Sequence, residues 1–249
     1  MDQKVPLVSS SDKLKRNAVA GTSSSIYPEN TEPMQEKYKW WRYIPLLKAT
    51  LRGDWKTAEN FFQRDKSALT GPIKETGDTA LHIAVLVGKE NIHFVEKLVE
   101  QMPVEALTST NFSGQTPLHV AAAIGNTKAA AILAGKHPPL LYIFAAGAVK
   151  ALPIHYAAML ARRDTLLYLL EVTRDDRVAV NETSCAEFID CLIAANFFDI
   201  ALKWVEKYPR LAIAELPAPA LLAMALKSSE FKSGSQLNFW QRKIYPCKF

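Results

Sequence analysis

Cysteine, glycine and long hydrophobic runs are all scarce in this sequence of 249 residues. The three cysteines are an odd number and all fall after residue 184, which argues against a disulfide framework and favours a reducing compartment. The most apolar run, residues 138–149, contains two prolines and is shorter than the roughly 20 residues of a membrane span. We expect a buried loop and turn there. The first residues carry no apolar run, which excludes a secretory signal, and Asp2 excludes N-myristoylation.

Motifs of catalytic and cofactor sites are also lacking. The chain contains no Gly-x-Ser-x-Gly elbow, no glycine-rich phosphate loop and no His-Glu-x-x-His pair. Cys185 and Cys191 are separated by five residues with no histidine beside them, which is a poor spacing for a metal site. We therefore expect no enzyme activity, no cofactor and no metal ion.

The charge distribution argues against a nucleic-acid partner. The formal net charge is +5, but it is unevenly spread along the chain. Residues 38–74 hold eight Lys/Arg against three Asp/Glu, whereas residues 75–110 hold two against six. Nucleic-acid binding requires a continuous basic stripe, and the acidic section interrupts it.

A repeated unit is what the sequence does contain. Residues 77–88, Gly-Asp-Thr-Ala-Leu-His-Ile-Ala-Val-Leu-Val-Gly, match residues 114–125, Gly-Gln-Thr-Pro-Leu-His-Val-Ala-Ala-Ala-Ile-Gly, with a shift of 37 residues. Residues 151–161 match again with a shift of 36. Weaker copies lie at residues 43–55 and 186–196. Self-similarity at this period indicates a repeat protein whose units bury their apolar faces against one another.

Each unit has the signals of a helix–turn–helix. Thr116 is typical of an N-cap, Pro117 of the first helical position, and Gly125 of a helix C-terminus. A second helix then follows, and its apolar pattern predicts an end at Leu133. Small alanines on the first helix allow neighbouring units to approach closely.

The motif Thr-Pro-Leu-His-x-Ala at this period resembles the ankyrin repeat. The resemblance implies an all-α solenoid of five to six stacked helix–turn–helix units with short turn or hairpin tips. Its terminal units are degenerate, because they cap the stack against water. The residues that carry the motif are Thr79, Leu81, His82, Gly88, Thr116, Pro117, Leu118, His119, Gly125, Pro153, Ile154 and His155.

The three histidines are interpreted as structural. The resemblance implies that His82 and His119 form hydrogen bonds within and between repeats beside Thr79 and Thr116. Leu152 replaces this threonine in the third copy, so hydroxyl capping is lost there. Histidines in successive layers, about 8–10 Å apart, do not converge on one ion with bonds of about 2 Å.

The predicted domain organisation has three parts. A polar, serine-containing segment of residues 1–37 is expected to be disordered. The repeat domain spans residues 38–228, and residues 229–249 form a linker-like tail. The expected repeats lie near residues 42–74, 75–109, 111–147, 148–182 and 183–214, with a partial one at 215–228.

Three segments carry a narrower resemblance: residues 43–55, residues 61–69, which we expect to form a loop, and residues 229–245. These are similar to the first repeat and the post-repeat segment of plant ankyrin proteins that end in a PGG membrane domain. The family implies stress or defence signalling at the plasma membrane. No hydrophobic span is present by residue 249, so we expect a truncated or unanchored member, located in the cytoplasm or at the cytoplasmic face of that membrane.

Two functions follow as hypotheses. The first is a protein–protein interaction scaffold without chemistry, whose partner residues lie at the turn tips and in the apolar turn: Glu75, Asp78, Phe112, Gln115 and Phe144. Phe112 is either a binding anchor or a plug on the neighbouring repeat, and residues 140–150 either pack beneath a loop or face a partner. The alternative is a membrane-associated regulator that forms oligomers with full-length relatives and contacts the membrane indirectly.

Overall fold

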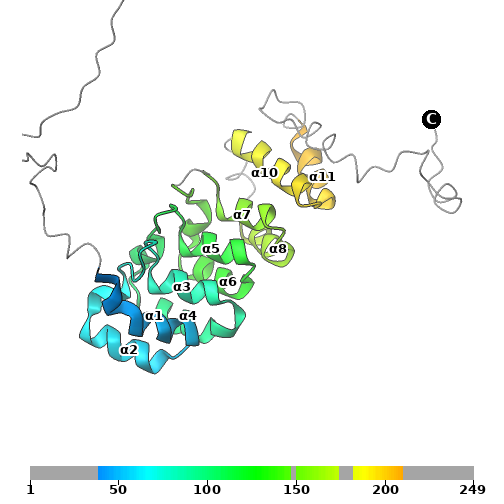
Figure 1. Ribbon diagram of the computed structural model, residues 1–249. Coiled ribbons are helices and arrows are strands. Elements are labelled where there is room, and N and C mark those ends of the chain that lie inside the picture. Colours follow the sequence, from blue (N-terminus) through cyan, green and yellow to red (C-terminus); the bar gives the residue numbers. More distant parts are fainter. Residues whose placement is uncertain (1–38, 147–149, 174–181, 210–249) are drawn as a thin grey trace, which may run out of the picture. The chain divides into compact units, whose positions relative to one another are not determined.

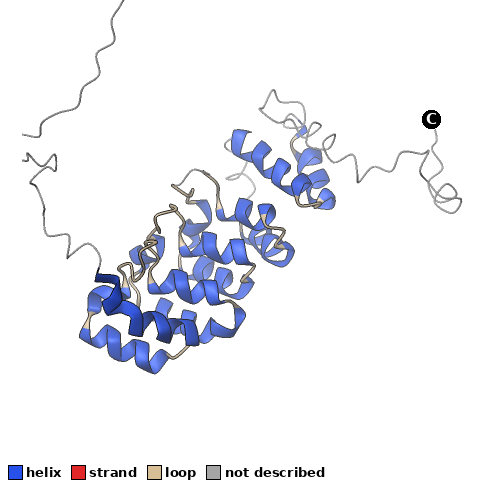
Figure 2. Ribbon diagram, in the orientation of Figure 1, coloured by secondary structure: helices blue, strands red, loops and turns tan. Residues whose placement is uncertain are grey.

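The computed structural model describes residues 39–146, 150–173 and 182–209 (Figure 1). Within these ranges the chain is helical, with no strand and one isolated β-bridge between Pro72 and Thr79 (Figure 2). The first helices of the units are α1 (Ile44–Arg52), α3 (Ala80–Val87), α5 (Pro117–Ile124), α7 (Pro153–Met159) and α10 (Glu182–Ala194). The second helices are α2 (Trp55–Arg64), α4 (Ile92–Gln101), α6 (Thr127–Lys136), α8 (Arg163–Val172) and α11 (Phe198–Lys207). Short 3-10 helices lie at η1 (Lys39–Tyr43), η2 (Lys66–Leu69), η3 (Lys89–Asn91), η4 (Val104–Thr108) and η5 (Pro138–Tyr142).

The helices form two packed layers. The first helices α1, α3, α5, α7 and α10 contact one another in chain order, and α4, α6 and α8 form a second row behind them. Each first helix also contacts the second helix of its own unit. This arrangement confirms the predicted all-helical solenoid. None of the described helices is both long and apolar enough to span a membrane.

The first helices approach closely because small side chains lie at their interfaces. Alanines on these helices are fully buried, namely Ala84, Ala121 and Ala157. The larger apolar residues of the motif fill the space between layers and are also buried, namely Leu81, Leu118 and Ile154. Each fully buried large apolar side chain contributes about 1.5–3 kcal/mol, so the motif positions supply much of the core.

The helix boundaries follow the sequence signals in α5 but not in α6. α5 begins at Pro117 after Thr116, and Gly125 ends it with φ of +82°, in the left-handed region that glycine adopts without strain. α6 extends to Lys136, three residues beyond the predicted end at Leu133. Burial continues to Ala134, one residue past the predicted end, and the exposed Gly135 and Lys136 then continue the helix.

The segment 61–69 is not a single loop, contrary to the expectation from the sequence. Phe62 is buried and continues the apolar face of α2, so this helix runs on to Arg64. Asp65 then caps η2, because its carboxylate accepts a hydrogen bond of 3.1 Å from the amide of Ser67.

Hydrogen bonds from the starts of the second helices join each unit to the preceding one. Asn91 donates its Nδ2 hydrogen to the carbonyl of Thr50 at 2.9 Å. Asn126 occupies the corresponding place at the start of α6 and donates to the carbonyl of Val85 at 3.2 Å. Both asparagines are buried, where a hydrogen bond is costly to lose.

Asn126 also caps its own helix, since its Oδ1 accepts a hydrogen bond from the amide of Ala129 at 3.2 Å. We expect Asn126→Ala to lower the free energy of unfolding by about 1–3 kcal/mol, because it removes the cap and one of the two hydrogen bonds that the Val85 carbonyl accepts. Urea denaturation measures this change. Asn60→Ala, at an exposed site on α2, is the matched control and should change stability by less than about 0.5 kcal/mol. Equal effects of the two substitutions would contradict the assigned role.

Several expectations concern parts of the chain outside the described residues. These are the tail of residues 1–37, the partial repeat at 215–228 and the segment 229–249. They stay predictions. The fifth copy at residues 186–196, in contrast, lies within the described part and forms most of α10, where Phe188 packs edge-on against Trp204 of α11 with ring centroids 5.0 Å apart.

Candidate interaction surface

Three loops that lead into first helices form what we call the fingers: residues 73–78, 111–115 and 145–151, the last without residues 147–149. Each finger is closed by one backbone hydrogen bond between its two ends. These bonds run from Ile73 to Asp78 at 2.8 Å, from Asn111 to Gln115 at 3.0 Å and from Ala145 to Ala151 at 3.0 Å, with the first residue as donor. The fingers are therefore short hairpin-like turns, as the ankyrin resemblance implies.

Successive fingers are also joined to one another. The amide of Phe112 donates to the carbonyl of Thr76 at 3.0 Å, and the amide of Ala146 donates to the carbonyl of Gly114 at 2.9 Å. Asn111 adds a side-chain bond of 2.9 Å to the carboxylate of Asp78. The described residues of the fingers thus form one continuous row in place of three independent loops.

Phe112 lies against the preceding finger and is still largely exposed. A Cβ atom at Gly77 would lie 2.6 Å from Cδ1 of Phe112 and 2.8 Å from its amide nitrogen. Gly77 therefore has to be glycine, both for this close approach and for its φ of +79°. Even so, 76% of the Phe112 side chain is exposed. The two interpretations of Phe112 are compatible, because one face packs and the rest remains available.

The other predicted partner residues occupy the same finger row. Glu75 is exposed at the tip of the first finger, and Asp78 is half-buried by its bond to Asn111. Gln115 is half-buried, since its carbonyl accepts the bond that closes the second finger. Phe144 is exposed just before the third finger.

In the apolar turn before Lys150, one part is packed in the core and another part is exposed, so each interpretation holds for part of the turn. Leu140 and Leu141 of η5 are buried in the core, as the interpretation of a packed turn expects. Phe144 is exposed instead and contributes to the surface. The buried part of this turn therefore supports the third finger and leaves one aromatic ring at the surface.

His82 ties the start of its own helix to the next finger. Its Nδ1 atom accepts from the amide of Thr79 at 3.3 Å and from the Thr79 hydroxyl at 2.8 Å. Its Nε2 atom donates to the carbonyl of Gln115 at 2.9 Å. The ring is thus neutral, with its proton on Nε2. The carbonyl that it reaches belongs to a predicted partner residue, so the histidine positions the finger.

His119 repeats this arrangement one unit later. Its Nδ1 lies 3.1 Å from the amide and 2.8 Å from the hydroxyl of Thr116, and its Nε2 donates to the carbonyl of Ala151 at 3.1 Å. His155 is equally buried, but Leu152 before its helix provides no side-chain cap. Its ring instead packs edge-on against Phe188 at 5.4 Å between centroids. No group of His, Cys, Asp and Glu in the described part of the chain is arranged to hold a metal ion.

Burial is the main reason why these histidines resist protonation. It lowers the pKa of His119 from 6.5 to about 4, and it lowers the pKa of His82 as well. The backbone carbonyls that accept from the rings raise both pKa values in part. The neutral form that the hydrogen bonds require is therefore retained at neutral pH.

This pKa predicts an acid-sensitive fold. Between pH 6.5 and about 4 the unfolded chain binds a proton at His119 that the folded chain does not, so stability falls as the pH drops through this window. The full loss is about 3 kcal/mol, at about 1.4 kcal/mol per pKa unit. We expect His119→Gln to be less stable than the wild type at pH 7.5 and to show a shallower decline to pH 4.5. Urea denaturation at stepped pH measures both.

His93→Gln serves as the matched control, because His93 is exposed on α4 with 73% of its side chain accessible. This variant should keep the slope of the wild type. A wild-type slope in His119→Gln would show that another group causes the acid sensitivity.

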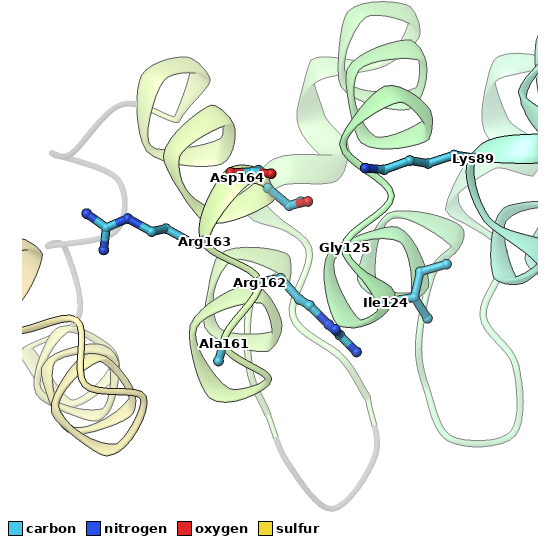
Figure 3. A pocket seen from close by; sticks show the side chains of 8 residues that line it. Lys89, Ile124, Gly125, Ala161, Arg162, Arg163 and Asp164 are labelled. Carbon is cyan, nitrogen blue, oxygen red and sulfur yellow. The ribbon is translucent and has the colours of Figure 1, made fainter.

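A polar cavity of about 420 Å³ lies on the side of the stack opposite the fingers, at the turns between first and second helices (Figure 3). Arg162 extends over Gly125 and donates from Nε to the carbonyl of Ala123 at 2.9 Å. Arg163 extends in the other direction and forms a two-point ion pair with Asp199 at 2.7 and 3.3 Å. Both guanidinium groups therefore join neighbouring units. We assign this cavity to the stacking of the repeats.

A second cavity, of about 540 Å³, lies between α7 and α10 beside the third finger. Glu187 and Asp190 of α10 line it together with Met159 of α7 and Lys150 of the finger. Burial, followed by the charge of Glu187, raises the pKa of Asp190 from 3.8 to about 6. Burial likewise raises the pKa of the Cys191 thiol at the same wall to about 11, so this thiol stays protonated at neutral pH.

Sequence reasoning did not find these two carboxylates. The repeat interval could have found them, because Asp190 follows His155 by 35 residues. The first two units have the same interval, from Leu47 to His82, at this position of the motif. The fifth copy was recognised by its small and apolar residues alone. Its polar positions differ from those of the central repeats, so the repeat pattern alone does not point to them.

The comparison with protein families agrees with this geometry. Residues 46–141, from α1 through most of η5, match the family described as ankyrin repeats, in three copies. A chain in the crystal structure of the yeast ribosomal protein Rps3 in complex with its chaperone Yar1 is similar at 20% identity and a TM-score of 0.44, covering 51% of this chain and 89% of that chain. A comparison with curated protein sequences gives no match. Residues 46–141 of this protein are ankyrin repeats.

Proposed function

We propose that this protein is a non-enzymatic scaffold that binds other proteins through its fingers and its row of first helices. The observation that carries the proposal is Phe112, whose ring is held over Gly77 by two linked fingers and is still 76% exposed. Aromatic side chains dominate binding energies at protein interfaces. An anchor that is fixed before binding loses little conformational entropy when the partner arrives.

Further exposed apolar side chains lie on the first helices. Leu86 of α3 and Met159 of α7 are about half exposed, at 52% and 46%, and Phe144 before the third finger is 44% exposed. Ankyrin repeats mediate binding to other proteins, and a stack of repeats offers an extended surface to a partner. These side chains supply apolar contacts beside the polar groups of the fingers.

The proposal extends to a cellular setting. Residues 43–55 resemble the first repeat of plant ankyrin proteins with a PGG membrane domain, and we assign this chain to stress or defence signalling in the cytoplasm. In the alternative form it acts at the cytoplasmic face of the plasma membrane by forming oligomers with full-length relatives. Co-immunoprecipitation with such a relative tests this alternative. Failure to recover a complex would remove the membrane role and leave the scaffold role standing.

The scaffold proposal predicts that Phe112→Ala lowers the affinity for the partner protein without unfolding the chain. A partner isolated with the wild-type chain should bind this variant at least about tenfold more weakly, because an anchor at the centre of an interface contributes 2 kcal/mol or more. Isothermal titration calorimetry measures the affinity. Circular dichroism checks that the helices remain intact.

Leu167→Ala provides the matched control, because Leu167 is also exposed, at 45%, but lies on α8 in the second row of helices. Binding of the partner should be unchanged in this variant. If Leu167→Ala weakens binding and Phe112→Ala does not, the partner surface lies on the second helices and the proposal is wrong.

A further inference from the structure

The cavity between α7 and α10 differs in chemistry from the other repeat interfaces. In the central repeats the positions facing the next finger hold a threonine and a histidine, as in Thr116 and His119. The motif histidines recur at intervals of 35 to 37 residues. Continued into α10, this interval puts Asp190 at the repeat position of the histidine and Glu187 at that of the threonine. The neutral pair is replaced by two carboxylates.

The local structure explains why these carboxylates are available. In α5 the threonine and histidine are used at the helix start and by the next finger. α10 instead begins at Glu182, five residues before Glu187, so the pair lies inside the helix and does not serve as a cap. Among the described residues, the carboxylates of Glu187 and Asp190 form no side-chain hydrogen bond or ion pair, and both residues line the open cavity.

The charge of the cavity favours a cationic occupant. Burial and the charge of Glu187 oppose ionisation of Asp190 and raise its pKa to about 6. A cation placed between the two carboxylates reverses this effect, because opposite charges within a few ångströms favour the ionised form. Lys150 lines the same cavity, but in the described part of the chain it forms no ion pair with either carboxylate.

The volume and the lining of the cavity further restrict which kind of cation it can hold. Met159, which is 46% exposed, and Ala151 form an apolar wall beside the carboxylates. Lysine and arginine pack their aliphatic stems on apolar surface while their charged ends reach polar groups. A cavity of about 540 Å³ accommodates one such side chain together with part of the backbone that carries it.

We propose that the cavity between α7 and α10 receives a lysine or arginine side chain of a partner polypeptide. This inference rests on the proposed scaffold function and names the partner chemistry of one part of the surface. Glu187 and Asp190 bind the charged end of the side chain. Met159 and Ala151 pack against its stem.

The test uses the full chain and a library of random 12-residue peptides displayed on phage. We expect the selected peptides to share a lysine or arginine at one position. The synthetic form of the strongest peptide should bind the double variant Glu187→Gln and Asp190→Asn at least about tenfold more weakly, because both charged acceptors are lost. Lys150→Gln should bind a few-fold more tightly, because a competing cation is removed.

The matched control is Glu171→Gln combined with Glu206→Gln, which changes the net charge equally at exposed sites on α8 and α11. This control should bind the peptide like the wild type. A ¹³C-methyl NMR spectrum should show the peptide shifting the Met159 resonance in the wild type but not in the double variant. Equal binding by the control and the double variant would overturn the proposal.

Other occupants give different results. If the chain self-associates in sedimentation and the double variant abolishes this association, a second copy fills the cavity and the proposal is wrong. If the peptide shifts the Met159 resonance only after Arg242, Lys243 and Lys248 are replaced by serine, the chain's own basic tail fills the cavity in the wild type, which also overturns the proposal. If the selected peptides share no basic residue, this inference is wrong. The proposed scaffold function is tested separately, because it is wrong if Phe112→Ala binds the partner as the wild type does.

Discussion

The structure depends on buried polar side chains that reach the backbone of a neighbouring repeat. His82 and His119 donate to carbonyls in the fingers that follow them, and Asn91 and Asn126 donate to carbonyls in the helices that precede them. A repeat of this size cannot bury its apolar face alone, and apolar contacts do not specify a direction of stacking. The hydrogen bonds do so, because an unpaired buried donor or acceptor is costly.

The same bonds connect the core to the candidate binding surface. Each histidine that holds two layers together also fixes the root of a finger, and the fingers are joined by backbone bonds between Phe112 and Thr76 and between Ala146 and Gly114. The exposed residues at the tips are thereby held on a rigid support. The burial of His82 and His119 between repeats lowers their pKa values, and their hydrogen bonds to the fingers hold the finger row in place before a partner binds.

Much of the repeat fold could be predicted from sequence, because its signals are local. Thr116, Pro117 and Gly125 act within one helix, and the spacing of the histidines shows directly in the chain. The end of α6 could not be predicted, since the buried Ala134 is a weak apolar signal and the exposed Gly135 and Lys136 continue the helix. The contact of Phe112 with Gly77 joins two different repeats, and the pattern of neither repeat contains it.

The candidate site was predictable only in part for a similar reason. The tips could be located from turn signals, and Phe112 stood out as an aromatic residue at a turn. The cavity beside Asp190 depends on how α10 begins, five residues ahead of Glu187. That early start changes two motif positions from capping groups into the lining of a cavity, which composition does not indicate.

The two sets of hydrogen bonds run in opposite directions along the stack. Units two and three each carry a forward donor, His82 or His119, and a backward donor, Asn91 or Asn126. The first unit has Leu47 and Asp54 at these two places and contributes an acceptor, the carbonyl of Thr50. A tandem copy of unit two or unit three would therefore bring both donors to its new interface, whereas a duplicated first unit would create an interface that lacks them.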